Sequence, residues 1–154
     1  SVVNVYYMDN LTAAAEAIAA EKNAALAEGE SPIEASTIDD EAIFRHLLET
    51  HPNLKGIYAT NLDSTQFVAE MLEPFDREDL YFVGIDGGKE QQKLLEEGIV
   101  DGLIYQNPYG IGYATVVAAA RSVLDLGNEA YVDSGFTWVT KANLKDAKVK
   151  KLLY

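Results

Sequence analysis

Short runs of β-branched and aromatic residues recur along the chain and predict five strands. Several of these runs are apolar at consecutive positions rather than at alternate ones. Consecutive apolar positions are typical of parallel strands that are covered on both faces. We therefore predict strands at residues 2–8, 56–60, 80–85, 100–105 and 136–140.

Longer segments with apolar residues at helical spacing separate these strands. Gly98 and Gly127 follow two of them, and Asp39 lies near the start of another, where its carboxylate can cap the helix. Capping explains the neighbouring acids Asp39, Asp40 and Glu41 better than a metal site does. The predicted helices are residues 11–28, 38–49, 64–72, 89–97, 110–126 and 143–152.

The alternation of strands and helices indicates the fold class. Repeated strand–helix–strand units form a parallel sheet with right-handed crossovers and helices on both faces. We predict one α/β domain over residues 1–154, with a three-layer, mainly parallel, doubly wound sheet of the flavodoxin or Rossmann kind. Because the chain starts at Ser1 and enters a strand-like run at once, we expect it to be part of a longer protein.

The composition narrows the range of functions. The net charge is −13, and so acidic a surface repels phosphate backbones and anionic lipid headgroups. The chain has no cysteine, which excludes thiolate metal sites, disulfides and cysteine nucleophiles. We expect no nucleic-acid partner, no membrane-surface partner and no cofactor.

Polar side chains follow four successive predicted strands. They are Asp9, Asn61, Asp86 and Gln106. In an open α/β sheet, ligands bind beyond the carboxyl ends of the strands, where these side chains should meet. Carboxylates accept hydrogen bonds and carboxamides both donate and accept, which is the mixture that the hydroxyls of a polyol need. No basic residue accompanies them, which argues against a phosphate or carboxylate ligand. The alternative is that each residue caps a helix or forms a turn.

No catalytic or metal-binding pattern accompanies this edge. His46 and His51 lack a third ligand at metal spacing, and no serine lies in a Gly-x-Ser-x-Gly elbow. The glycines at positions 84, 87 and 88 do not have the G-x-G-x-x-G spacing of a dinucleotide site. We therefore expect a protein that is not an enzyme. The aromatic residues Phe136, Trp138, Tyr105 and Tyr109 are expected to pack rather than to hold a ligand.

Several segments, in order, resemble the type I periplasmic sugar-binding proteins, which include ribose-binding-protein-like receptors, and the LacI-type repressors. The segments are PNLKGIYATN at 52–61, VGIDG at 83–87, EGIVDGLIYQNP at 97–108 and GIGY at 110–113. Ile85 replaces the phenylalanine usual in the second segment. By this resemblance, Asn61, Asp86 and Gln106 are the positions that bond sugar hydroxyls, and Asp9 is a looser match. Residues 11–36 are longer and richer in alanine than in the family.

The resemblance implies the C-terminal lobe of a two-lobed protein whose N-terminal lobe is absent from this sequence. Such a protein binds a small sugar or polyol between its lobes and delivers it to an ABC permease outside the cytoplasm, either in the periplasm or lipid-anchored at the cell surface. The apolar stripe within residues 110–126 would need a partner. We expect it to fold back on its own sheet or to be buried against another chain, including self-association.

Three other functions share this pattern. The chain could be the effector domain of a LacI-type repressor or a periplasmic sugar-sensing module of a signalling system. A flavodoxin-like enzyme is the remaining alternative. The segment WVTKAN at 138–143 resembles the transport receptors more than the repressors.

Overall fold

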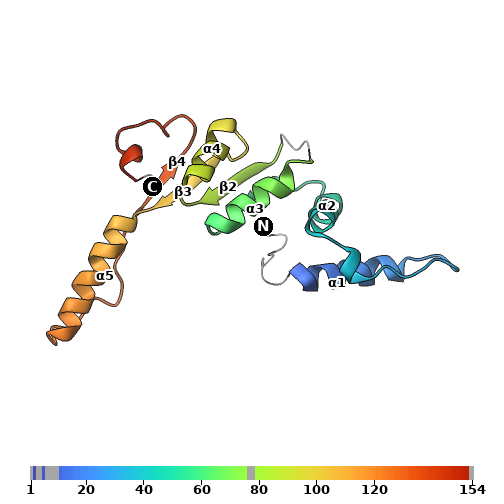
Figure 1. The fold of residues 1–154 in the computed structure, drawn as a ribbon, viewed down its shortest axis with the longest axis horizontal. Coiled ribbons are helices and arrows are strands. Elements are labelled where there is room, and N and C mark those ends of the chain that lie inside the picture. Colours follow the sequence, from blue (N-terminus) through green and yellow to red (C-terminus); the bar gives the residue numbers. More distant parts are fainter. Residues whose placement is uncertain (1, 3–4, 6–10, 76–78, 153–154) are drawn as a thin grey trace. The chain divides into compact units, whose positions relative to one another are not determined.

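A computed structural model describes residues 2, 5, 11–75 and 79–152 (Figure 1). The chain divides into two compact units. The first comprises Ser1–Lys55 and Met71–Arg77, and the second comprises Gly56–Glu70 and Glu78–Tyr154. Apart from Val2 and Val5, the strand predicted at residues 2–8 lies outside the described residues. In the part of the chain that is described, no helix is long and apolar enough to cross a membrane.

The first unit is built around two helices, α1 (Leu11–Ala24) and α2 (Asp40–Thr50), with the short 3-10 helix η2 (Ala35–Thr37) between them. Its small core is formed by Ala15 and Ile18 of α1 and Ile43 of α2. Asp39 caps α2, because its Oδ1 accepts a hydrogen bond of 2.8 Å from the backbone N–H of Ala42. The capping expected for the acidic cluster is thus confirmed at Asp39.

Helix α1 ends earlier than predicted, at Ala24 rather than at residue 28. The carboxamide of Asn23 binds Ile33 on both sides: Nδ2 donates to the Ile33 oxygen at 2.9 Å, and Oδ1 accepts from its N–H at 2.7 Å. This pair of bonds ties the end of α1 to a residue ten positions later. The chain between them therefore turns back as a loop instead of continuing the helix.

The second unit contains a four-stranded sheet in the order β1-β2-β3-β4. β1 (Gly56–Tyr58), β2 (Tyr81–Ile85) and β3 (Gly102–Gln106) run parallel, and β4 (Phe136–Val139) pairs antiparallel with β3. The helices along this part of the chain are α3 (Leu62–Leu72), α4 (Lys89–Glu97) and α5 (Pro108–Val123). The predicted α/β class, with a mainly parallel sheet flanked by helices, is confirmed.

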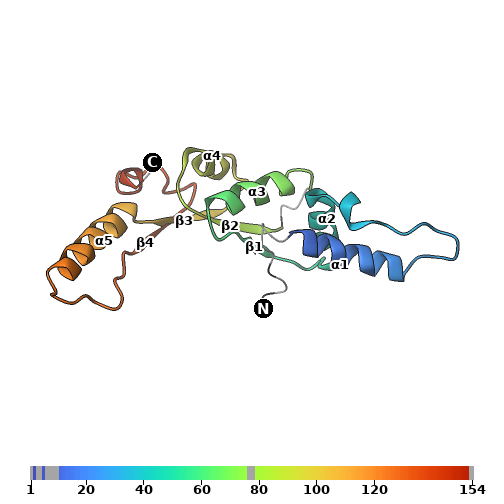
Figure 2. The same cartoon turned by 60° about the horizontal axis from the view of Figure 1, so that its bottom comes forward.

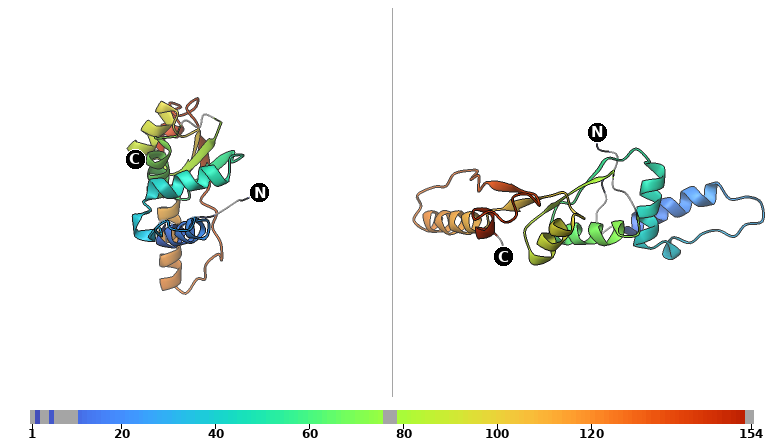
Figure 3. Two further views of the ribbon diagram at one scale, coloured as in Figure 1. Left: turned by 90° about the vertical axis from the view of Figure 1, so that its right-hand side faces the viewer. Right: turned by 90° about the horizontal axis from the view of Figure 1, so that it is seen from above.

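One face of the sheet carries the core of this unit. Helices α3 and α4 lie on the same side of the strands (Figures 2 and 3). Phe82, Leu103 and Val139 are buried on that face, and the neighbouring positions Tyr81 and Trp138 point to the other face and are exposed. Strict alternation of side chains across each strand produces this division.

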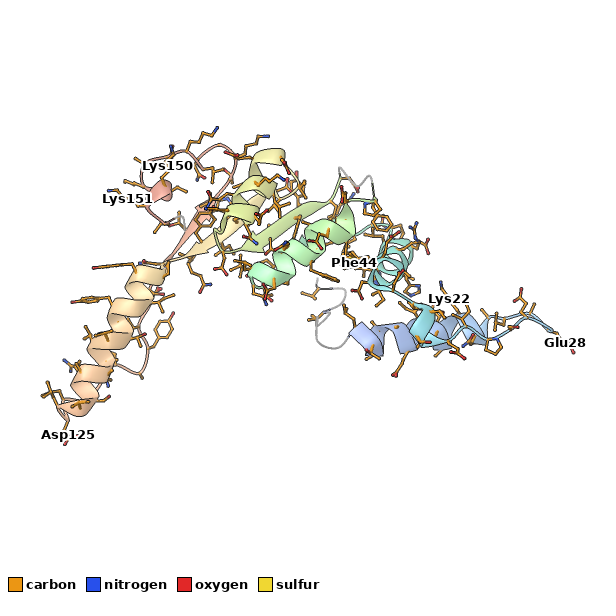
Figure 4. All side chains as sticks on the ribbon, in the orientation of Figure 1. Lys22, Glu28, Phe44, Asp125, Lys150 and Lys151 are labelled. Atoms are coloured by element: carbon orange, nitrogen blue, oxygen red, sulfur yellow. The ribbon has the colours of Figure 1, made fainter. Side chains whose placement is uncertain are left out.

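Helix α5 packs differently from the other helices of this unit. None of its residues is buried, and Tyr113, Val116 and Val123 are strongly exposed. In Figure 4, side chains project from α5 on both sides of the helix. The expectation that this segment folds back on its own sheet is therefore wrong for this structure, whereas burial against another chain, including self-association, stays a prediction.

The helix predicted at residues 143–152 is also wrong. The segment forms successive turns and only one short 3-10 helix, η3 (Val149–Lys151). Asn143 holds the chain in a turn, because its Oδ1 accepts from the Thr140 N–H at 2.8 Å and its Nδ2 donates to the Trp138 oxygen at 3.1 Å. Leu144 and Val149 are nevertheless buried.

Candidate functional site

The carboxyl ends of β1, β2 and β3 place three of the four predicted site residues at one edge of the sheet. Asn61 follows β1, Asp86 directly follows β2, and Gln106 is the last residue of β3. These strands are parallel neighbours, so their carboxyl ends share an edge. Asp9 lies outside the described residues.

Asp86 and Gln106 are in direct contact. The Gln106 Nε2 donates a hydrogen bond of 2.8 Å to Oδ1 of Asp86. The pair joins a half-buried carboxylate from one strand end to an exposed carboxamide from the next. Together they present a carboxylate that can accept further hydrogen bonds beside a carboxamide oxygen.

The backbone at Asp86 is fixed in an unusual conformation. Its φ is 75°, in the left-handed region, and its N–H donates to the Ile104 oxygen at 3.0 Å. Aspartate tolerates this region better than most residues do. The next residue, Gly87, lies so close to Tyr105 that an added Cβ would be 2.6 Å from the ring. The turn after β2 therefore places Asp86 next to the carboxyl end of β3 and leaves the backbone there little room to move.

Asn61 has a structural role in addition to its place at this edge. Its Oδ1 accepts from the Ser64 N–H at 2.8 Å, and the Ser64 hydroxyl oxygen accepts from the Asn61 N–H at 3.1 Å. This reciprocal pair is a capping box at the start of α3. The capping alternative is confirmed for Asn61. Within the described residues its Nδ2 makes no hydrogen bond, so the donor half of the carboxamide is available to a ligand.

Thr65 links Asn61 to the end of β2. Its side chain is fully buried, and Oγ1 both donates to the Asn61 oxygen at 2.7 Å and accepts from the Ile85 N–H at 3.1 Å. Strand β1 has ended by this point, so the hydroxyl takes the place of a further strand partner for Ile85. Sequence reasoning did not single out this residue, since a threonine inside a helix gives no special signal.

Phe136 is a residue for which the prediction from sequence is wrong, here in its burial. We expected it to pack, but the residue is 73% exposed. It is the register partner of Gln106 in the antiparallel pair and thus lies at the same edge. Phe136 and Trp138 are two positions apart in one strand, so their spacing alone predicts that they share a face. In the structure that face is exposed, and Val139 is buried on the other.

Of the two histidines, His46 lies beside an acidic residue. His46 Nε2 lies 3.4 Å from a carboxylate oxygen of Glu21, in the first unit. Among the residues that the structure describes, no group of three histidine, aspartate or glutamate side chains could hold a metal ion. Tyr105 is buried as expected, whereas Tyr109 is exposed.

Comparison with known proteins gives several matches. The family described as periplasmic binding protein domain matches residues 8–128. A carbohydrate transporter solute-binding protein from Agrobacterium radiobacter, solved with D-arabinose, is 30% identical, with a TM-score of 0.64; the match covers 73% of this chain and 38% of that one. A glucose-galactose binding protein from Geobacillus stearothermophilus is 26% identical, with a TM-score of 0.59 and coverage of 66% and 36%.

A third structure is described as an ABC transporter, LacI family transcriptional regulator, from Brachyspira murdochii. It is 27% identical, with a TM-score of 0.57, and the match covers 75% of this chain and 40% of that one. The search of curated proteins gave no match. The chain thus spans between 36% and 40% of the length of these three structures. With most of its residues inside the matched segment, the chain belongs to the periplasmic binding protein domain family.

Proposed function

We propose that this chain supplies one wall of a cleft that binds a small sugar or polyol without chemical change. The observation that carries the proposal is the contact between Asp86 and Gln106 at the carboxyl edge of the sheet. Among the structures at or above 25% identity, those from Agrobacterium radiobacter and Geobacillus stearothermophilus are described as sugar-binding or solved with a sugar. Asn61, Asp86, Gln106 and Asp9 are the proposed ligand-binding residues.

The bonding capacity of these groups suits hydroxyls. Asp86 uses one lone pair on Gln106 and keeps other acceptor sites for sugar O–H groups. The Gln106 Oε1 accepts and the Asn61 Nδ2 donates, so both polarities of a hydroxyl can be met. A hydrogen bond to a charged partner is worth about 1.5–3 kcal/mol. The contact with Gln106 also holds the Asp86 carboxylate in place before a ligand arrives, which reduces the entropy lost on binding.

The second wall of the cleft would come from a preceding lobe of a longer protein. In this proposal the sugar stabilises a closed form of the two lobes, and that form docks on an ABC permease. The protein would act outside the cytoplasm, in the periplasm or anchored to the cell surface by lipid. The exposed apolar side chains of α5, among them Val116 and Val117, would be covered by the other lobe or by a second chain.

A second candidate function is the effector domain of a transcriptional repressor. The similarity to the structure from Brachyspira murdochii, described as a LacI family regulator, supports it. Both candidates use the same cleft and differ in the remainder of the protein. Upstream coding sequence separates them. A lipoprotein signal with a cysteine supports transport or sensing, whereas a helix-turn-helix supports the repressor and excludes transport and sensing.

Titration with pentoses and hexoses tests the sugar proposal. In a two-lobed parent protein we expect a thermal shift with at least one of them, confirmed by calorimetry. The 154-residue chain by itself should bind the same sugar at least about a hundredfold more weakly, because half of the contacts and most of the desolvation are missing. Equal affinity of the two proteins would contradict the proposal that this chain forms only one wall of the binding cleft. Absence of any sugar binding by the parent would contradict the proposed sugar-binding function.

A further inference from the structure

The pairing of β3 with β4 ends where the chain leaves the sheet. The last register pair is Gln106 with Phe136. Continued further, the same register would set Pro108 opposite Ser134. Helix α5 begins at this residue, so β3 has no further strand residue to pair with the returning chain at Ser134.

The side chain of Asn107 supplies the donor instead. Its Nδ2 donates a hydrogen bond of 3.1 Å to the main-chain oxygen of Ser134, a residue 27 positions later. The other half of the same carboxamide caps α5, since Oδ1 accepts from the Gly110 N–H at 2.9 Å. A helix cap requires only the acceptor, so the bond from Nδ2 is a second and separate function.

The surroundings keep this carboxamide in place. A Cβ at position 110 would lie 2.5 Å from Asn107 Nδ2, so the glycine leaves the room that the amide occupies. The returning chain is shaped as well: Asp133 Oδ1 accepts from the Gly135 N–H at 2.8 Å, and Gly135 has a φ of 72°. Positive φ is readily adopted by glycine. Both segments thus meet at Asn107 in defined conformations.

We propose that Asn107 is a positioning residue that fastens the returning chain to the end of β3 and thereby holds Gln106 on Asp86. Asn107 directly follows Gln106. Ser134 lies two residues before Phe136, which is the register partner of Gln106. The fastened point is therefore immediately beyond the last backbone pair, where a strand end would otherwise fray. Only the use of Gln106 for a ligand rests on the function proposed above.

The replacement Asn107→Asp separates the two roles of the side chain. Aspartate caps a helix as well as asparagine does, but it has no donor for the Ser134 oxygen. In the 154-residue chain without ligand, we expect the backbone amides of residues 134–137 to exchange about tenfold faster, from the loss of one hydrogen bond. The side-chain amide protons of Gln106 should exchange faster as well, and the amides of α5 should keep their rates. Hydrogen exchange followed by NMR gives all three quantities.

Two further variants make the result decisive. Ser134→Ala keeps the main-chain oxygen that accepts the bond, so it should exchange like the unaltered chain. Asn107→Ala removes both bonds and should speed exchange in α5 as well. If Asn107→Asp leaves residues 134–137 unchanged, Asn107 is only a cap and the proposal fails. If those amides respond while the Gln106 side chain does not, the positioning of Gln106 is wrong. Neither outcome depends on whether a sugar binds.

Discussion

Replacing Asp86 by asparagine or glycine in a two-lobed parent protein is expected to weaken sugar binding by about a hundredfold or more. The estimate for glycine rests on the loss of two hydrogen bonds that the carboxylate would make to sugar hydroxyls, at about 1.5–3 kcal/mol each. Asparagine keeps one acceptor oxygen, but it loses the charge and has a donor in place of the other oxygen. Each 1.4 kcal/mol corresponds to a tenfold change in affinity. The bond from Gln106 holds the carboxylate for this role at 2.8 Å. Calorimetric titration measures the change.

The conformation of Asp86 determines which replacements are informative. With φ at 75°, an alanine at this position would be strained, and lost binding could then reflect a distorted turn. Glycine adopts this φ freely and asparagine tolerates it. Asp86→Gly should therefore keep the thermal stability of the protein while removing the affinity. Undiminished binding by either variant would remove Asp86 from the site.

Thr65→Val is expected to lower the free energy of unfolding by about 1–3 kcal/mol. Valine has nearly the shape of threonine, so packing against Gly84 is kept, but the methyl group cannot accept the Ile85 N–H. That donor is then left unsatisfied beside a side chain that is fully buried. The Asn61 oxygen loses less, because it also accepts from the Thr65 N–H at 3.0 Å. Urea denaturation of the 154-residue chain measures the difference.

Thr115→Val provides the matched control. Thr115 also lies inside a helix, and its hydroxyl donates to the Ile111 oxygen at 2.8 Å, but the side chain is exposed and accepts no strand N–H. We expect a change within about 0.5 kcal/mol. Equal effects of the two replacements would show that the link between α3 and β2 at Thr65 contributes no stability of its own.

The positions of most helices and strands could be predicted from sequence because they depend on local patterns. Runs of β-branched and aromatic residues favour strands, and the predicted segments around β2 and β3 have them. Helix α4 was predicted with its observed bounds, since Gly98 adopts a left-handed conformation with a φ of 85° directly after it. The shared edge of Asn61, Asp86 and Gln106 then follows from the parallel direction of their strands.

Features that depend on contacts between distant residues could not be predicted. Nothing in the pattern of residues 136–140 specifies that β4 runs antiparallel to β3. The bonds of Asn23 to Ile33 shorten α1, and those of Asn143 turn the chain where a helix was expected. In each case an asparagine side chain competes with the helix for backbone groups. A carboxamide in a sequence does not show which backbone group it will bind.

The same limit applies to the candidate site. Asparagine at a strand end suits both a helix cap and a ligand, and Asn61 does cap α3 with one half of its carboxamide. The direct bond between Asp86 and Gln106 required both the register of β2 with β3 and the left-handed turn at Asp86. The sequence indicated the chemistry of the edge, whereas the pairing of its groups came from the structure.

The side-chain amide resonances of Asn61 and Gln106 test the central claim most directly. In a two-dimensional NMR titration of the two-lobed protein with the sugar that gives the largest thermal shift, both should move in proportion to saturation. The side-chain amide of Asn23, which is bound to the Ile33 oxygen at the end of α1, should serve as an unaffected reference. Saturation by the sugar without movement of Asn61 and Gln106 would show that the ligand binds elsewhere and would contradict the proposed site.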